Sequence, residues 1–129
     1  MLDRPKEIDP EAVTRANIDL SERIFREGLS IVYDDDGDTL LLTIGEAAEA
    51  ITQQFIDGIY VRIHPVTLKI VGCTIVGLVS DIFAHNKAIR KLFGDSFERF
   101  RRAGGREEWR GLEAQRALPL FEVAISHRV

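Results

Sequence analysis

Short apolar segments alternate with turn residues over residues 29–78, and this pattern constrains the fold more than any other part of the chain. In segments 39–44 and 59–63, apolar side chains occupy every second position. Successive side chains of a β-strand point to opposite faces, so this spacing predicts strands with one buried face. Turn residues at 34–38 and 64–67 separate the strands. We therefore expect an antiparallel sheet of four or five strands in meander order.

Three further segments complete the expected sheet. Residues 30–33 and 69–76 are rich in the β-branched and apolar side chains that favour strands. Residues 46–56 fit either a helical turn or a strand, and the alternation in the sequence ITQQF favours a strand over 50–55. Gly72 lies within the last strand, which indicates a bulge or the close approach of another backbone.

Apolar residues recur at helical spacing on both sides of the sheet segment. They predict a helix over 10–27, with Asp9 as its N-cap and Gly28 as its C-terminal stop. A second helix is expected over 80–103, where Ser80 is a favourable N-cap. Both helices have an apolar stripe that requires a packing partner.

The last third of the chain has the weakest pattern. Residues 106–117 fit a short helix that ends before Pro119. Residues 120–126 fit an extended tail that pairs with a sheet edge, in this chain or in a partner. Residues 106–129 are therefore expected to be helical or extended.

Together these segments predict a single α+β domain over residues 1–129, with an N-terminal helix, the antiparallel sheet and a helical C-terminal third. With 129 residues, of which 45% are apolar, the chain is long enough to bury a core. One face of the sheet should pack on the helices. A sheet this small leaves edges exposed, so we expect self-association, most simply as a two-fold dimer.

Composition and the N-terminal segment predict a soluble cytoplasmic protein. The first twelve residues are charged and lack the apolar core of a signal peptide. No segment approaches the roughly 18 uninterrupted apolar residues of a membrane span. Cys73 is the only cysteine, so it has no partner for an internal disulfide, and it is expected to be a small buried apolar residue.

The acidic segment 34–38 has the alternating aspartates that begin an EF-hand calcium loop. The rest of that motif is missing, because Thr39 stands where a glycine is required and Gly45 where a bidentate glutamate is required. We interpret this segment as a solvated hairpin turn rather than as a metal site.

No catalytic, cofactor-binding or metal-binding arrangement is recognisable elsewhere in the sequence. His64, His85 and His127 lack the i, i+4 spacing that presents two imidazoles to one metal ion. Cys73 has no sequence context typical of a nucleophile. A glycine-rich phosphate loop is also missing. We therefore expect a non-enzymatic protein without a cofactor.

Aromatic residues in the C-terminal third indicate a surface for a protein partner. Phe93, Phe97 and Phe100 fall on one face of the expected helix, which is the spacing of a packing surface. The expected extended segment at 118–125 could add to this surface. The residues predicted to form the partner interface are Phe93, Phe97, Phe100, Trp109, Leu120 and Phe121.

Charge is unevenly distributed, which suggests nucleic-acid binding as an alternative function. Residues 1–60 contain 14 acidic and 5 basic side chains, whereas residues 87–110 contain 8 basic and 4 acidic side chains. Arginines interleaved with aromatics can bind phosphates and stack on bases, although a solvated helix face has the same composition. The arginines concerned are Arg99, Arg101, Arg102, Arg106 and Arg110.

Two motifs occur in the sheet segment: Tyr33-Asp34 followed by Asp38-Thr39-Leu40, and Asp57-Gly58-Ile59-Tyr60-Val61-Arg62-Ile63 followed by Pro65, Thr67 and Lys69-Ile70-Val71-Gly72. With these motifs, residues 30–78 resemble the DUF2283 family of small prokaryotic domains without an established activity. His64 departs from the family pattern, in which an acidic residue usually precedes the turn. The resemblance implies an antiparallel sheet with a flanking helix, and an antitoxin-like or other partner-binding role.

Overall fold

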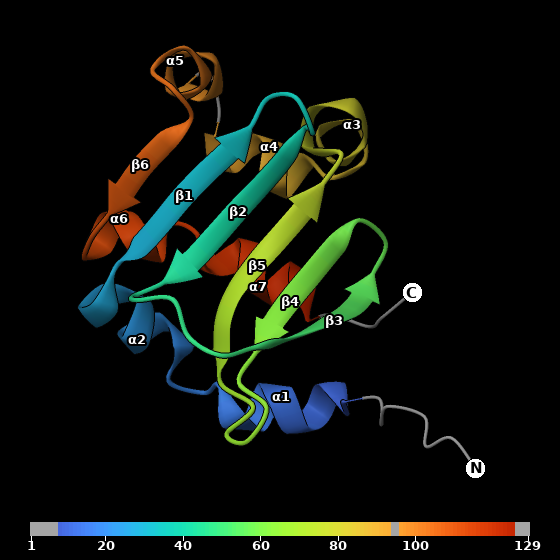
Figure 1. The fold of residues 1–129 in the computed structure, drawn as a ribbon, viewed down its shortest axis with the longest axis vertical. Coiled ribbons are helices and arrows are strands. Elements are labelled where there is room, and N and C mark those ends of the chain that lie inside the picture. The colour runs from blue at the N-terminus through green and yellow to red at the C-terminus, as the bar shows by residue number, and fades with distance from the viewer. Residues whose placement is uncertain (1–7, 94–95, 126–129) are drawn as a thin grey trace.

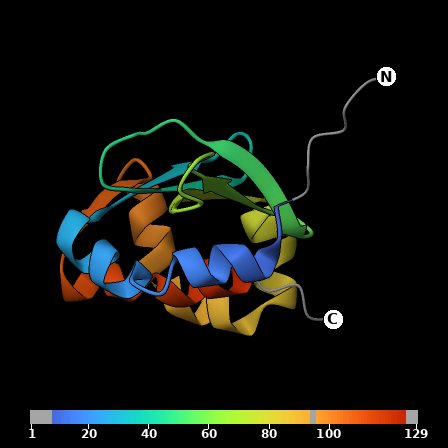
Figure 2. The same cartoon turned by 90° about the horizontal axis from the view of Figure 1, so that it is seen from below.

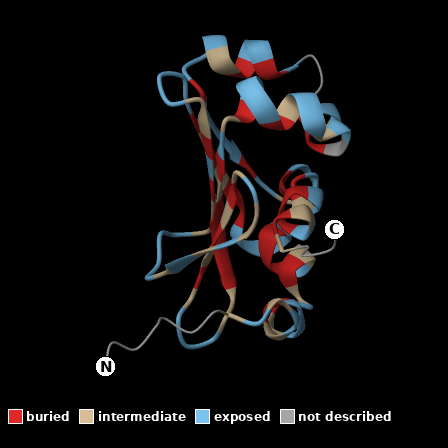
Figure 3. Cartoon of the chain, turned by 90° about the vertical axis from the view of Figure 1, so that its right-hand side faces the viewer, coloured by how far each residue is buried: buried red, intermediate tan, exposed pale blue. Residues whose placement is uncertain are grey.

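A computed structural model describes residues 8–93 and 96–125 of the chain, and Figure 1 shows their arrangement. The described residues form one antiparallel sheet and a set of helices, so the α+β class expected from the sequence is confirmed. Figures 2 and 3 show that the helices gather on one side of the sheet. No helix within the described ranges is long and apolar enough to cross a lipid bilayer.

The strands pair in the order β3-β4-β5-β2-β1-β6, and every described pairing is antiparallel. The expected meander is wrong in two respects, because β5 lies between β4 and β2 and because β6 extends the sheet beside β1. The connection over 45–50 crosses the end of the sheet to reach the far edge, which leaves β2 free to pair with β5 (Figure 1). The strands are β1 (Leu29–Asp34), β2 (Thr39–Ile44), β3 (Ile51–Ile56), β4 (Ile59–Ile63), β5 (Ile70–Val76) and β6 (Arg106–Trp109).

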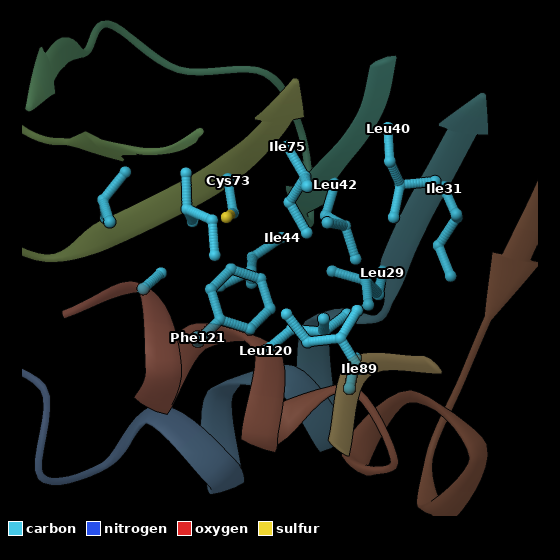
Figure 4. Close-up of a cluster of buried hydrophobic side chains, with 14 of the residues drawn as sticks. Leu29, Ile31, Leu40, Leu42, Ile44, Cys73, Ile75, Ile89, Leu120 and Phe121 are labelled. Atoms are coloured by element: carbon cyan, nitrogen blue, oxygen red, sulfur yellow. The ribbon is translucent and has the colours of Figure 1, made fainter. Parts of the chain in front are cut away.

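The inner face of the sheet forms the core with the C-terminal helix α7 (Leu118–Ala124). Leu42 of β2 and Val61 of β4 both lie opposite Cys73 of β5, and all three side chains are fully buried. Figure 4 shows Phe121 of α7 pointing toward this face. Burial of one such apolar side chain contributes about 1.5–3 kcal/mol. Burial also raises the pKa of the Cys73 thiol to about 12, so Cys73 is the buried apolar residue that we expected.

The single helix expected over 10–27 is two helices, α1 (Pro10–Ala16) and α2 (Leu20–Glu27). Asn17 separates them because its side chain bonds to distant backbone. Its Nδ2 donates to the carbonyl oxygens of Val13 at 2.7 Å and Leu68 at 2.9 Å, and its Oδ1 accepts from the Ile70 N–H at 2.8 Å. These bonds attach the N-terminal helices to the loop between β4 and β5.

The single helix expected over 80–103 is also divided. It consists of a π-helical turn η1 (Leu78–Ile82), α3 (Phe83–His85), α4 (Lys87–Phe93) and α5 (Ser96–Arg102). Asn86 has extended backbone angles of φ −132° and ψ 96°, which end α3. Its side-chain oxygen accepts a hydrogen bond from the Ile89 N–H at 3.0 Å, which begins α4. Residues 94 and 95, between α4 and α5, lie outside the described residues.

The C-terminal third differs most from expectation. The expected helix over 106–117 is instead the strand β6 followed by α6 (Leu112–Gln115). The expected extended segment at 118–125 is the helix α7, with Pro119 in its first turn. Leu120, Phe121 and Ala124 share one face of α7, and burial of this face against the sheet favours the helix. The end of the expected tail, 126–129, lies outside the described residues.

Candidate functional site

The apolar side chains expected at a partner interface lie inside the chain's own core. Phe97 packs edge-to-face against Tyr33 and Phe83, with ring centroids 5.1 and 5.2 Å apart. No member of the set is more than 7% exposed. The expectation of exposed aromatics is therefore wrong, because the aromatic stripe packs against other parts of the same chain. The buried residues are Phe93, Phe97, Phe100, Trp109, Leu120 and Phe121.

The arginines proposed for nucleic-acid binding do not have equivalent surroundings. Arg101 Nη2 lies 2.6 Å from Asp35 Oδ1, and Arg101 Nη1 lies 3.5 Å from Glu98 Oε1. Arg101 therefore links α5 to the turn between β1 and β2. Two glutamates directly follow the arginine of β6, which reduces the positive charge of that strand. The exposed arginines are Arg99, Arg102, Arg106 and Arg110.

Asp38, at the end of the acidic turn, has a structural role. Its Oδ1 accepts hydrogen bonds from the Tyr33 hydroxyl at 2.5 Å and the Val79 N–H at 2.9 Å, and its Oδ2 accepts from the Ser80 N–H at 2.9 Å. Desolvation raises the pKa of this carboxyl, but the hydrogen bonds outweigh it and lower the pKa to about 2. Asp38 thus holds the start of η1 against the hairpin as an anion.

The histidines also have local roles. His64 Nδ1 accepts from the Val66 and Thr67 N–H groups at 3.1 and 3.3 Å, so its ring holds the turn after β4. His85 Nδ1 lies 2.9 Å from Asp81 Oδ1. His127 lies outside the described residues. Within the described ranges, no group of three or more His, Cys, Asp and Glu side chains is placed to hold a metal ion.

Arg62 crosses the outer face of the sheet and joins three strands. Its Nη2 donates to the Leu42 carbonyl at 2.6 Å and to Thr43 Oγ1 at 2.9 Å. Gly72 lies between Arg62 and β2, and a Cβ at this position would meet the Leu42 carbonyl oxygen at 2.5 Å. The close approach expected from this glycine is therefore confirmed. Burial lowers the pKa of Arg62, and its Nε is buried without a hydrogen-bond partner among the described residues.

The two edges of the sheet differ in charge. The edge strand β3 has the sequence ITQQFI and contains no charged residue and no proline. Its Thr52 and Gln54 side chains are exposed, and Ile51 is 41% exposed. The opposite edge strand, β6, has the sequence REEW and is mostly charged. Charges, prolines and β-bulges are the usual means of preventing an edge strand from pairing with another chain. Strand β3 has no charge and no proline, and its pairing with β4 shifts register between Gln54 and Ile56.

A small pocket lies next to β6, between α4, α5 and α6. Three of the aromatics that were expected at a partner interface, Phe93, Phe100 and Trp109, line this pocket. Its volume is about 160 Å³. We call this cavity the Trp109 pocket. Four charged side chains also line it. The charged residues are Arg99, Glu107, Glu113 and Arg116.

Trp109 fixes one anion and one cation at the pocket wall. Its indole Nε1–H donates to Glu107 Oε2 at 2.8 Å. The Arg116 guanidinium carbon lies over the same indole ring, 5.6 Å from the centroid. Arg116 Nη2 also donates to the Leu92 carbonyl at 3.2 Å. Both side chains are exposed, and these contacts place one charge of each sign beside the indole ring.

The sequence predicted four residues of this pocket but gave them other roles. Phe93, Phe100 and Trp109 were expected at a protein interface, and Arg99 was expected to bind nucleic acid. The sequence-based hypotheses did not include Glu107, Glu113 or Arg116. Arg116 and Trp109 are seven positions apart on different elements, so no periodic pattern links them. A second, open hollow of about 380 Å³ adjoins Arg116 and is lined by Lys91, Leu92 and Pro119.

Comparisons with known proteins give no relative for this chain: no protein-family model, no curated protein and no solved structure matches it. They neither support nor refute the DUF2283 resemblance.

Proposed function

We propose that the protein is a non-enzymatic interaction module that self-associates through the β3 edge. The observation that carries this proposal is the uncharged edge strand ITQQFI, which among the described residues pairs with β4 on one side and with no strand on the other. The aromatic surface that first suggested an interface is buried, so the open edge replaces it as the proposed contact.

A second copy is the simplest occupant of this edge. Two β3 strands related by a two-fold axis run antiparallel, so the two sheets join into one continuous sheet. An uncharged strand that pairs with itself brings no like charges together. At the other edge, β6 carries Arg106, Glu107 and Glu108, which disfavour the same kind of pairing.

The test is sedimentation velocity of the full chain at concentrations up to about 100 µM, which detects contacts of micromolar strength. The edge variant carries Thr52→Glu and Gln54→Glu, both at exposed positions of β3. Its matched control carries Ile18→Glu and Val66→Glu, at residues that are 88% and 82% exposed and lie outside the strands. We expect dimers for the wild type and the control, and monomers for the edge variant. A monomeric wild type, or an edge variant that stays dimeric, contradicts the proposal.

The DUF2283 resemblance suggests a different occupant of the same edge, namely a strand of a partner protein in an antitoxin-like complex. An added strand gains main-chain hydrogen bonds in the same way as a second copy. Co-purification from the native host distinguishes the two occupants. A stoichiometric partner lost in the Thr52→Glu/Gln54→Glu variant but retained in the Ile18→Glu/Val66→Glu control supports the partner.

Nucleic-acid binding through the exposed arginines is the competing proposal. Arg101 is engaged with Asp35, so Arg102 and Arg106 are better positions for charge reversal. Salt-dependent retention on DNA or RNA that is lost in Arg102→Glu/Arg106→Glu supports it. No retention at about 50 mM salt, where phosphate contacts are strong, excludes it.

A further inference from the structure

The Trp109 pocket combines charges of both signs with an aromatic surface. Arg99 and Arg116 are matched by Glu107 and Glu113, so the charges around the cavity sum to zero. No ion pair is recorded among these four side chains within the part of the chain that the structure describes. Each of them therefore has capacity to bind a further group.

The charge pattern selects the class of ligand. A simple anion is attracted by the arginines but repelled by the glutamates, and a simple cation meets the opposite pattern. A molecule that carries one carboxylate and one ammonium group satisfies both signs at once. The planar guanidinium of Arg116 suits a carboxylate, which it can bind through two parallel hydrogen bonds. The free carboxylate oxygen of Glu107 can accept from an ammonium group.

The aromatic side chains and the volume restrict the ligand further. Phe93, Phe100 and Trp109 offer apolar contacts, and the hydroxyl of Ser96, which also lines the pocket, already donates to the Phe93 carbonyl. A cavity of about 160 Å³ holds roughly five water molecules at about 30 Å³ each, and drug-sized ligands occupy about 300 Å³ or more. The ligand is therefore small.

We propose that the Trp109 pocket binds a free α-amino acid with a compact apolar side chain. Arg116, with Arg99, receives the carboxylate, and Glu107, with Glu113, receives the ammonium group. The side chain rests on Phe93, Phe100 and Trp109. The pocket adjoins β6, whereas the proposed self-association uses β3 at the opposite edge, so the two proposals fail or succeed independently.

Binding can be followed by the fluorescence emission of Trp109, because it is the only tryptophan of the chain and lines the pocket. The full-length protein is titrated with L-valine, L-leucine, L-isoleucine and L-methionine up to about 10 mM, a range that covers millimolar affinities. We expect a saturable change in Trp109 emission and a rise in Tm for at least one of them. The absence of a saturable response to all four overturns the proposal.

Chemical analogues test the requirement for both charges. N-acetyl-L-leucine lacks the ammonium group and L-leucinamide lacks the carboxylate, so both should bind at least about tenfold more weakly than L-leucine, a loss of about 1.4 kcal/mol. Equal binding of either analogue contradicts the proposal. A response to sodium phosphate at the same concentration as L-leucine shows an anion site and also overturns it.

Variants test the assignment of residues. Glu107→Gln keeps an oxygen to accept from the Trp109 indole but removes the charge, and Arg116→Gln removes the guanidinium. Each should weaken amino-acid binding at least about tenfold. Glu108→Gln and Arg102→Gln, at exposed positions that do not line the pocket, should leave the affinity for the amino acid unchanged. Circular dichroism confirms that the variants are folded, and folded pocket variants that bind as tightly as the wild type refute the assignment.

Discussion

At the scale of single residues, Asp38 shows how one carboxylate joins two elements that are far apart in sequence. It accepts hydrogen bonds from Tyr33 and from the Val79 and Ser80 N–H groups. Burial raises the pKa of the Tyr33 hydroxyl, and the hydrogen bond to the Asp38 anion raises it further. The neutral phenol therefore remains the donor and the carboxylate the acceptor at physiological pH.

We predict that Asp38→Asn lowers the free energy of unfolding near neutral pH by about 1 kcal/mol, a value that allows for solvent screening at this partly buried group. Asn tolerates the positive φ of 47° at this position, so the change tests the charge rather than the backbone. The pKa of Asp38 is lowered in the folded state to about 2 from 3.8. Its contribution is therefore present above about pH 4 and is lost as the pH falls toward 2.

Urea unfolding at several pH values between about 2 and 7 checks this prediction. The difference between wild type and Asp38→Asn should shrink at the acidic end, and a difference that stays constant over this range contradicts it. Asp36→Asn is the control, because the Asp36 side chain is exposed and makes no recorded hydrogen bond within the described part of the chain.

At the scale of elements, periodicity predicted helices over 10–27 and 80–103 but not the positions at which they break. The apolar spacing over 10–27 is continuous, yet Asn17 ends α1 because Leu68 and Ile70 supply its hydrogen-bond partners. The spacing over 80–103 is likewise interrupted at Asn86. The partners of Asn17 are recruited by folding from a segment some 50 positions away, so a local pattern carries no sign of them. Asn86 instead accepts from the nearby Ile89 N–H.

We predict that Asn17→Ala destabilises the protein by about 2–4 kcal/mol, because it leaves the buried Ile70 N–H and the Val13 and Leu68 carbonyls without partners. Hydrogen exchange should show faster exchange of the Ile70 amide. Thr14→Ala removes only an exposed bond to Pro10 and should cost less than about 0.5 kcal/mol. Equal costs for the two variants would show that the α1–loop connection does not stabilise the fold.

At the scale of the whole molecule, the C-terminal helix determines whether the chain completes its own core. Phe121 is fully buried beneath the sheet, with Leu120 and Ala124 on the same face of α7. This packing covers one face of the sheet, and the partner that we propose therefore meets the β3 edge rather than α7.

We predict that Phe121→Ala lowers the free energy of unfolding by about 3–5 kcal/mol, the usual cost of removing a buried aromatic ring. Phe25→Ala, at a residue that is 48% exposed, should cost less than about 1 kcal/mol. Urea unfolding followed by circular dichroism and by Trp109 emission should give coincident transitions. An unchanged stability of Phe121→Ala would mean that α7 is not part of the cooperative core.

The sequence by itself determined the α+β class, a sheet of at least four strands within residues 29–78 and the burial of Cys73, because these depend on local periodicity and on apolar content. Strand order, the break at Asn17, the strand β6 and the helix α7 were decided by tertiary structure. Each depends on pairing or packing with residues far along the chain. The Trp109 pocket also depends on tertiary structure, because only folding brings Arg116, at the end of α6, over the indole ring whose N–H donates to Glu107.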